Sequence, residues 1–164
     1  MRWLITAQLI LLTLAIQIAW VPHVIVWDAW PDVLLILVVQ IAFSLTAADA
    51  FVTAWCTGLL YDLRVAEPAG MWAMLYGLAA LAVSKVFGRD RSAILPTRLF
   101  TVLLASLLVN LGGILINTFH GHPIGWLHVK RLFLNSFYTT IAAIVFLPVF
   151  AFLMKRLHPQ QRRG

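Results

Sequence analysis

The stretch Thr57-Gly58-Leu59-Leu60-Tyr61-Asp62 decides the fold, because it closes an apolar tract with an acid. A carboxylate within the hydrocarbon of a bilayer costs several kcal/mol, so an acid marks either a membrane surface or a pocket lined by protein. Asp32 opens the same tract and Asp49 interrupts it. We therefore expect the tract to fold back on itself as two short helices, with Asp49 in the connection between them.

Composition places the whole chain in a membrane. The chain has 164 residues, of which 62% are hydrophobic and 11% charged, and its mean hydropathy is +0.93. Such a chain has too little polar surface to close a soluble globule. The uncharged runs 3–27, 99–119 and 132–154 each reach the roughly 20 residues that a membrane-spanning helix needs. The first run is too long for a signal peptide. We expect an all-α integral membrane protein with one polytopic domain over residues 1–164.

Charge distribution predicts the topology. We expect six transmembrane helices, at about residues 3–21, 33–45, 51–63, 69–87, 97–119 and 132–154. Because the second and third are shorter than the bilayer is thick, they require local thinning of the lipid, shielding by neighbours or a partly re-entrant hairpin. With the N-terminus inside, nine cations lie on the inner side, namely Arg2, Lys85, Arg89, Arg91, Arg98, Lys155, Arg156, Arg162 and Arg163. Arg64, Lys130 and Arg131 lie outside. Merging the two short helices reverses this bias, so the positive-inside rule favours six spans and two cytoplasmic termini.

Small and polar residues indicate where helices pack. Ala73 and Gly77 lie four residues apart in the helix 69–87, a spacing that lets another helix approach closely. Gln8, Ala15 and Ala19 mark a possible packing face on the first helix. Ser106, Asn110, Gly113 and Asn117 form one stripe on the helix 97–119, and Asn135 adds an amide to the last helix. Because amides in hydrocarbon need partners, these polar residues should face other helices. Pro148 predicts a kink in the last helix.

Asp62 is the most informative polar residue. Gly58 precedes it by four positions and therefore lies on the same helix face. The negative end of the helix dipole is unfavourable for an anion, so we expect a cationic partner such as Arg64 or a neighbouring subunit's cation. A solvated acid at the end of a helix is the alternative.

The candidate chemistry is sparse. The predicted outer side carries residue types that zinc accepts as ligands, namely His120, His122, His128, Asp28, Asp32, Asp62 and Glu67. No metal-binding motif accompanies them. We therefore interpret the histidines as interfacial and expect no metal or other cofactor. The single cysteine, Cys56, is expected to be a small buried hydrophobe. No serine or acid pair has the partners of an intramembrane protease, so we do not expect an enzyme.

Nucleic acid and a transported small molecule are two further candidate partners. The net charge of +6 sits at helix ends and in the tail, which favours contact with lipid head groups and not with nucleic acid. A transporter needs a binding cavity, which Gln40, Asn110, Asn117 and Asn135 could line. Such amides are more often contacts between helices.

Three motifs together resemble a known family. They are Pro31-Asp32 before an apolar run, Gly58-Leu59-Leu60-Tyr61-Asp62, and Pro68-Ala69-Gly70-Met71. In this combination the chain resembles the rod shape-determining protein MreD family. Members typically show a Pro-Asp that opens helix 2, a Gly-Leu-x-x-Asp that ends helix 3 and a glycine at the entry to helix 4. The chain departs from the pattern at Trp55-Cys56, where members often carry glycine.

The resemblance implies a non-enzymatic scaffold of the bacterial cell-elongation machinery in the inner membrane. Its partners would be an MreC-like periplasmic protein, a RodA-like polymerase, a class B penicillin-binding transpeptidase and MreB filaments. We expect partner binding through Asp32, Gly58, Asp62, Gly70, Ala73 and Gly77. The fold is also similar to the substrate-binding subunits (S-components) of energy-coupling-factor vitamin transporters. A transporter subunit is therefore the alternative function.

Overall fold

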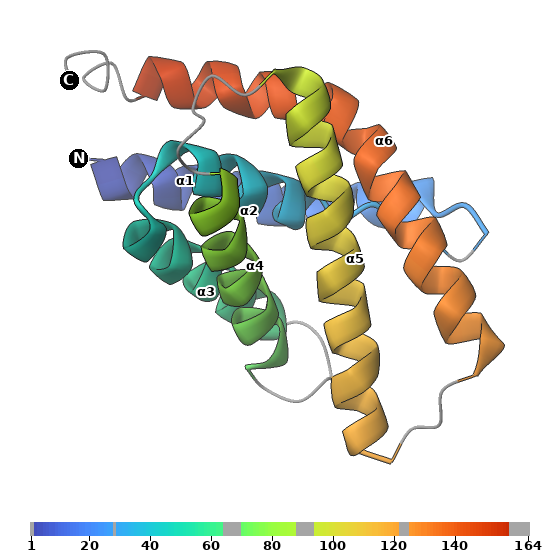
Figure 1. Ribbon diagram of the computed structural model, residues 1–164. Coiled ribbons are helices and arrows are strands. Elements are labelled where there is room, and N and C mark those ends of the chain that lie inside the picture. The colour runs from blue at the N-terminus through green and yellow to red at the C-terminus, as the bar shows by residue number, and fades with distance from the viewer. Residues whose placement is uncertain (1, 28, 64–69, 88–93, 122–124, 158–164) are drawn as a thin grey trace.

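The computed structural model describes residues 2–27, 29–63, 70–87, 94–121 and 125–157, with side chains from residue 6 to residue 154. Over these residues the chain forms six α-helices, a short 3-10 helix and no strand (Figure 1). The all-helical prediction is therefore confirmed. The elements are α1 (Arg2–Ala19), η1 (Val21–Val24), α2 (Val33–Ser44), α3 (Ala47–Asp62), α4 (Met71–Phe87), α5 (Leu95–Phe119) and α6 (Trp126–Leu157).

The apolar tract after Asp32 divides into two helices at Leu45 and Thr46. Thr46 is the N-cap of α3, where its hydroxyl accepts a hydrogen bond from the Asp49 backbone N–H at 3.3 Å and donates one to the Asp49 carboxylate at 2.9 Å. Asp49 thus lies in the first turn of α3, where the helix dipole favours an anion. We expected it in the connection, which is shorter than predicted because the Thr46 cap starts α3 at Ala47.

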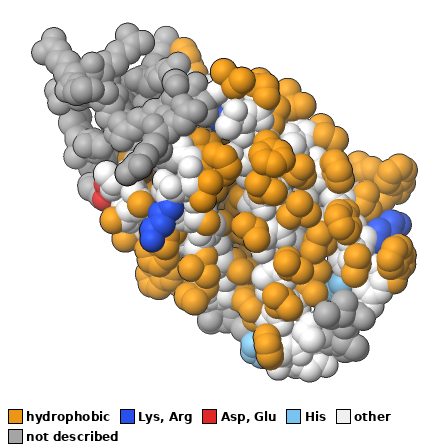
Figure 2. Space-filling model, in the orientation of Figure 1, with side chains coloured by type: hydrophobic (Ala, Val, Ile, Leu, Met, Phe, Trp, Pro, Cys, Tyr) orange, Lys and Arg blue, Asp and Glu red, His pale blue; other side chains and the backbone are white. Residues whose placement is uncertain are grey.

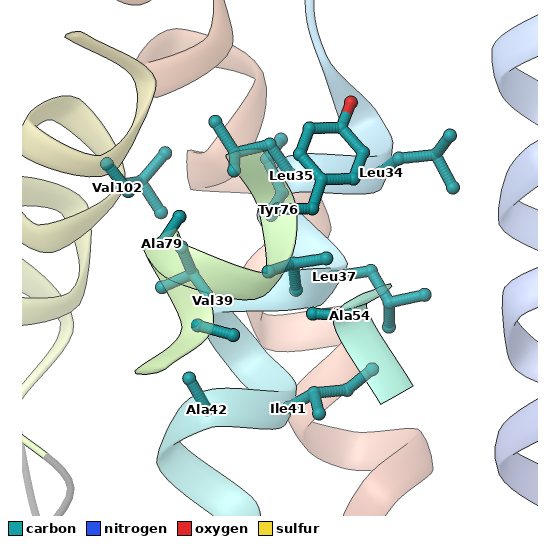
Figure 3. Close-up of a cluster of buried hydrophobic side chains, with 14 of the residues drawn as sticks. Leu34, Leu35, Leu37, Val39, Ile41, Ala42, Ala54, Tyr76, Ala79 and Val102 are labelled. Carbon is teal, nitrogen blue, oxygen red and sulfur yellow. The ribbon is translucent and has the colours of Figure 1, made fainter. Parts of the chain in front are cut away.

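Helix α2 is the centre of the molecule. Every residue from Val33 to Phe43 is buried, and α2 contacts α1, α3, α4, α5 and α6. In Figure 3 its side chains leave the helix on different sides, with Leu37 on one side and Val39 on another, among Tyr76 and Ala79 of α4 and Val102 of α5. A helix that is apolar all round has no face for water and needs neighbours on every side.

The surface of the molecule is also apolar. Hydrophobic side chains cover most of the face in Figure 2, between charged side chains at its margins. Large exposed side chains line α5 and α6, among them Leu104, Leu108, Leu111, Leu115, Phe133, Phe137, Ile141 and Val145. Two stretches, Leu95–Phe119 and Trp126–Met154, are long and apolar enough to cross a membrane, while Thr6–Ala19, Val33–Ser44 and Met71–Phe87 are shorter.

The packing face predicted for α1 is wrong. Gln8, Ala15 and Ala19 are exposed, and α1 instead buries a face that contains Thr13 and Gln17. The Gln17 amide decides the orientation, since it accepts a hydrogen bond from the Val33 N–H at 2.9 Å and donates one to the Pro31 carbonyl at 3.3 Å. A buried amide needs both kinds of partner, and the start of α2 supplies them.

The structure also bears on the expectations for Cys56 in α3 and Pro148 in α6. Cys56 is exposed, so its predicted burial is wrong. The buried face of α3 is carried by Thr53, Ala54, Thr57 and Gly58, which leaves Cys56 on the opposite side. Helix α6 contains Pro148 in its interior, and Figure 1 shows the helix changing direction in its red, C-terminal part.

Candidate functional site

The junction of α3 and α4 brings together most of the residues singled out from the sequence. A Cβ atom on Gly58 would collide with the backbone of Trp72 and Ala73. Glycine is therefore what allows the end of α3 to touch the first turn of α4, backbone against backbone. Ala73 is fully buried at this contact.

One turn further along α4, Gly77 continues the contact. A Cβ atom at this position would lie 3.0 Å from the ring of Phe51 on α3. The small residues Ala73 and Gly77 thus face α3 of the same chain. The close-packing stripe that the sequence predicts on α4 is occupied within the molecule.

The Asp62 carboxylate closes the junction by binding three backbone N–H groups. Its Oδ2 accepts from Gly70 and from Ala73, each at 3.1 Å, and its Oδ1 accepts from Trp72 at 3.0 Å. These donors belong to the start of α4, where backbone N–H groups have no partner within the helix. Gly70 has a φ of +90°, a conformation that side chains disfavour.

This geometry explains how the Asp62 carboxylate is stabilised at the C-terminal end of a helix. The carboxylate lies at the negative end of α3 but also at the positive end of α4, whose dipole favours an anion. The expected cation is not needed for this purpose, and Arg64 lies outside the described residues. A carboxylate held by three N–H donors serves as a structural cap of the helix that follows.

Asp32 caps a second helix on the same pattern. Its Oδ1 accepts from the Leu35 N–H at 2.9 Å, which fixes the start of α2. Its Oδ2 accepts from the Tyr76 hydroxyl of α4 at 2.7 Å, and its own N–H donates to Thr139 of α6 at 3.0 Å. One acid therefore connects α2, α4 and α6.

Aromatic side chains join the two acid caps. Tyr61 and Trp72 meet edge to face with their ring centroids 5.4 Å apart. Tyr76 lies 5.8 Å from Trp72 and 6.3 Å from Tyr61. Tyr61 directly precedes Asp62 in sequence, and the row of rings ends at the Tyr76 hydroxyl, which binds Asp32. We call Asp32, Asp62, Tyr61, Trp72 and Tyr76 the double-cap cluster.

Sequence reasoning missed two members of this arrangement. Tyr76 lies in α4 and its partner Asp32 is 44 residues away, so no local spacing indicates such a bond. The Thr139 hydroxyl was likewise not singled out as a partner of Asp32. The available signal is that a carboxylate between apolar runs requires hydrogen-bond donors, which does not by itself identify the side chains that supply them.

The polar residues of α5 and α6 pair in different places. Asn110 donates to the Ser106 carbonyl at 2.8 Å and to the Ser136 hydroxyl of α6 at 3.5 Å. Asn117 is half-buried near the end of α5. Asn135 instead accepts from the Trp30 N–H at 3.2 Å and holds the segment before α2.

The residues considered for a transport cavity do not converge. Gln40 binds Arg98 of α5 at 3.1 Å, whereas Asn110 and Asn135 have the separate partners given above. Of the histidines, His120 contacts the Ile116 carbonyl at 2.9 Å and His128 accepts from the Gly125 N–H at 3.2 Å. His122, Asp28 and Glu67 lie outside the described residues.

Comparison with known families finds a match over most of the chain. The model of the family described as "MreD: rod shape-determining protein MreD" matches residues 1–157, which confirms the resemblance drawn from the three motifs. No curated protein and no solved structure matches the chain.

Proposed function

Because the chain belongs to the MreD family of rod shape-determining proteins, we propose that it is a non-enzymatic scaffold of the bacterial cell-elongation complex. The family match and the two long apolar helices make it a membrane protein with a role in rod shape. Six spans in the inner membrane, with both termini in the cytoplasm, are the topology we propose.

The observation that carries the proposal is the double-cap cluster. Its carboxylates accept hydrogen bonds from backbone and hydroxyl donors of other helices, so they hold those helices together. The result is a pair, α3 and α4, whose mutual geometry is fixed by backbone contact at Gly58. A scaffold needs such a rigid surface, because a preorganised surface loses little entropy when a partner binds.

The outer side of this helix pair is the proposed docking face. Exposed apolar side chains occur on α3 at Val52, Trp55 and Leu60 and on α4 at Met74 and Leu78. Gly58, Asp62, Gly70, Ala73 and Gly77 set the shape of this face from within, and Asp32 fixes the start of α2 behind it. Helices of partner proteins would bind here by close packing, as helices associate in lipid.

The proposed partners are an MreC-like periplasmic protein, a RodA-like polymerase, a class B penicillin-binding transpeptidase and, across the membrane, MreB filaments. The motif residues that carry the family resemblance are the ones that build the α3–α4 pair. This agreement is what connects the geometry to the shape-determining role.

The test uses cells that depend on this chain for rod shape. Depletion should round the cells, and the intact chain should restore rods. Asp62→Leu should fail to restore them and should recover several-fold less MreC-like partner in co-purification. The matched control is Asp49→Leu, which also removes a helix-end carboxylate but leaves α4 untouched, and it should behave as the intact chain. Equal partner recovery by the two variants, or growth restored by a single vitamin, would contradict the proposal.

A further inference from the structure

A groove between α4 and α5 is not used by the double-cap cluster. It has a volume of about 200 Å³ and is lined by Ala79, Ala82, Val83, Val86, Phe87, Thr101, Leu104, Ala105 and Leu108. Except for Thr101, every lining side chain is apolar. Because Ala82 and Leu104 at its edges are exposed, the groove opens to the outside of the helix bundle. Its apolar lining is suited to contact with part of a hydrocarbon chain.

Two cations are close in sequence to residues that line one end of this groove. Lys85 directly precedes Val86 in α4, and its side chain is exposed and bonded to no group in the described part of the chain. Arg98 lies one helical turn before Thr101. It is held by Gln40 at 3.1 Å and lies 5.4 Å from the centre of the Phe43 ring. An apolar groove that ends beside positive charge is complementary to a molecule with an acyl chain and an anionic head.

We propose that the α4–α5 groove is a binding site for one acidic phospholipid of the inner leaflet. The acyl chain lies between α4 and α5, and the phosphate pairs with the Lys85 ammonium, near Arg98. Attraction of an anionic head group to Lys and Arg at the cytoplasmic surface supplies the selectivity, and the apolar lining supplies contact area.

This inference rests on the membrane topology proposed above, since that topology places Lys85 and Arg98 at the cytoplasmic surface. It does not depend on any protein partner. A lipid that fills the groove would brace α4 against α5 in the region lined by Val83, Thr101 and Ala105. The site would thereby couple the position of α5 to the lipid composition of the leaflet.

The test measures the unfolding temperature of the purified full chain in maltoside micelles. Phosphatidylglycerol should raise that temperature by several degrees, because a ligand that binds only the folded chain stabilises it. Phosphatidylcholine with the same acyl chains should raise it much less. Glycerol phosphate, which has the head group but no acyl chain, should give no shift.

Two kinds of variant test the charged part and the apolar part of the site separately. Lys85→Gln should lose the difference between the two lipids, and Lys85→Arg should retain it. Ala82→Leu, which fills the open edge of the groove, should lose the shift with phosphatidylglycerol. The matched controls are Lys130→Gln, a cation on α6, and Ala15→Leu, an exposed alanine on α1, and both should respond as the intact chain.

Equal shifts with both lipids, or an equal shift with glycerol phosphate, would overturn the proposal. So would a Lys85→Gln variant that still distinguishes the lipids, or a Lys130→Gln variant that loses the difference as fully. Because the measurement uses no partner and no cell, its failure would leave the scaffold role standing. Failure of the shape test would likewise leave lipid binding standing.

Discussion

At the scale of single residues, Asp62 and Gly58 have roles that differ from their appearance in the sequence. A carboxylate at the end of an apolar helix suggests a search for a cation, but Asp62 binds three N–H groups of the next helix. Gly58 makes this possible because it lets the backbone of α4 come within reach. The two residues act together, so we expect their substitution to affect stability differently from the substitution of other acids and glycines.

Removing the Asp62 cap should destabilise the start of α4 without unfolding the core around α2. Loss of an N-cap costs about 0.5–2 kcal/mol, and Asp62→Leu removes all three acceptor contacts. We expect Asp62→Leu to lower the free energy of unfolding by about 2 kcal/mol, near the upper end of that range. Asp62→Asn, which keeps one side-chain oxygen, should lose about half as much. Denaturant unfolding of the purified chain measures both, and a neutral Asp62→Leu would contradict the cap.

Gly58 and Gly113 form a matched pair of glycines inside helices. A Cβ at Gly58 meets the backbone of α4, whereas a Cβ at Gly113 meets no atom within 4 Å in the described part of the chain. Gly58→Ala should therefore destabilise the chain by about 1–3 kcal/mol through overpacking. Gly113→Ala should stabilise it by up to about 1 kcal/mol, since alanine favours helix. Opposite signs in thermal unfolding are the expected result, and equal effects would exclude the backbone contact.

At the scale of helices, the acid caps connect elements that are distant in the chain. Tyr76 of α4 donates to the acid that starts α2, and Thr139 of α6 accepts from the same residue. Displacing α4 would therefore disturb the start of the central helix. A partner that binds the α3–α4 pair could in this way affect α2 and α6.

The coupling between α2 and α4 can be measured with a double-mutant cycle. Tyr76→Phe removes the hydroxyl, and Asp32→Asn removes the charge that accepts from it. A hydrogen bond to a charged group contributes about 1.5–3 kcal/mol, so the two changes should be non-additive by about 1 kcal/mol or more. Asp32 paired with Tyr138→Phe is the control cycle, because Tyr138 binds the Val24 carbonyl and should be additive with Asp32. Additivity in both cycles would contradict the link.

The elements were predictable where charge and hydropathy alone specify them. Acids between apolar runs indicated the break between α2 and α3, and Pro148 indicated the bend of α6. The packing faces of the helices were harder to predict from the sequence, because they depend on partners distant in sequence. The orientation of α1 follows from Gln17 bonding to the start of α2, and nothing within α1 distinguishes that face from the alanines at 15 and 19. Cys56 was misplaced for the same reason.

At the scale of the whole molecule, we propose that the tract from Asp32 to Asp62 enters the membrane and returns. The helix break at Leu45 and Thr46 would then lie on the same side as both termini. The ends of α2 and α3 that carry Asp32 and Asp62 would lie on the other side, with the double-cap cluster. This placement determines which partners and which leaflet the molecule meets.

Cysteine accessibility tests it most directly. In a Cys56→Ser background, Thr46→Cys and His120→Cys would each be labelled with a membrane-impermeant maleimide, in spheroplasts and in inverted membrane vesicles, beside a tag at the C-terminus. We expect Thr46→Cys to react only in inverted vesicles, where the C-terminal tag is also accessible, and His120→Cys to react only in spheroplasts. Labelling of Thr46→Cys in spheroplasts, with the tag still inside, would contradict it.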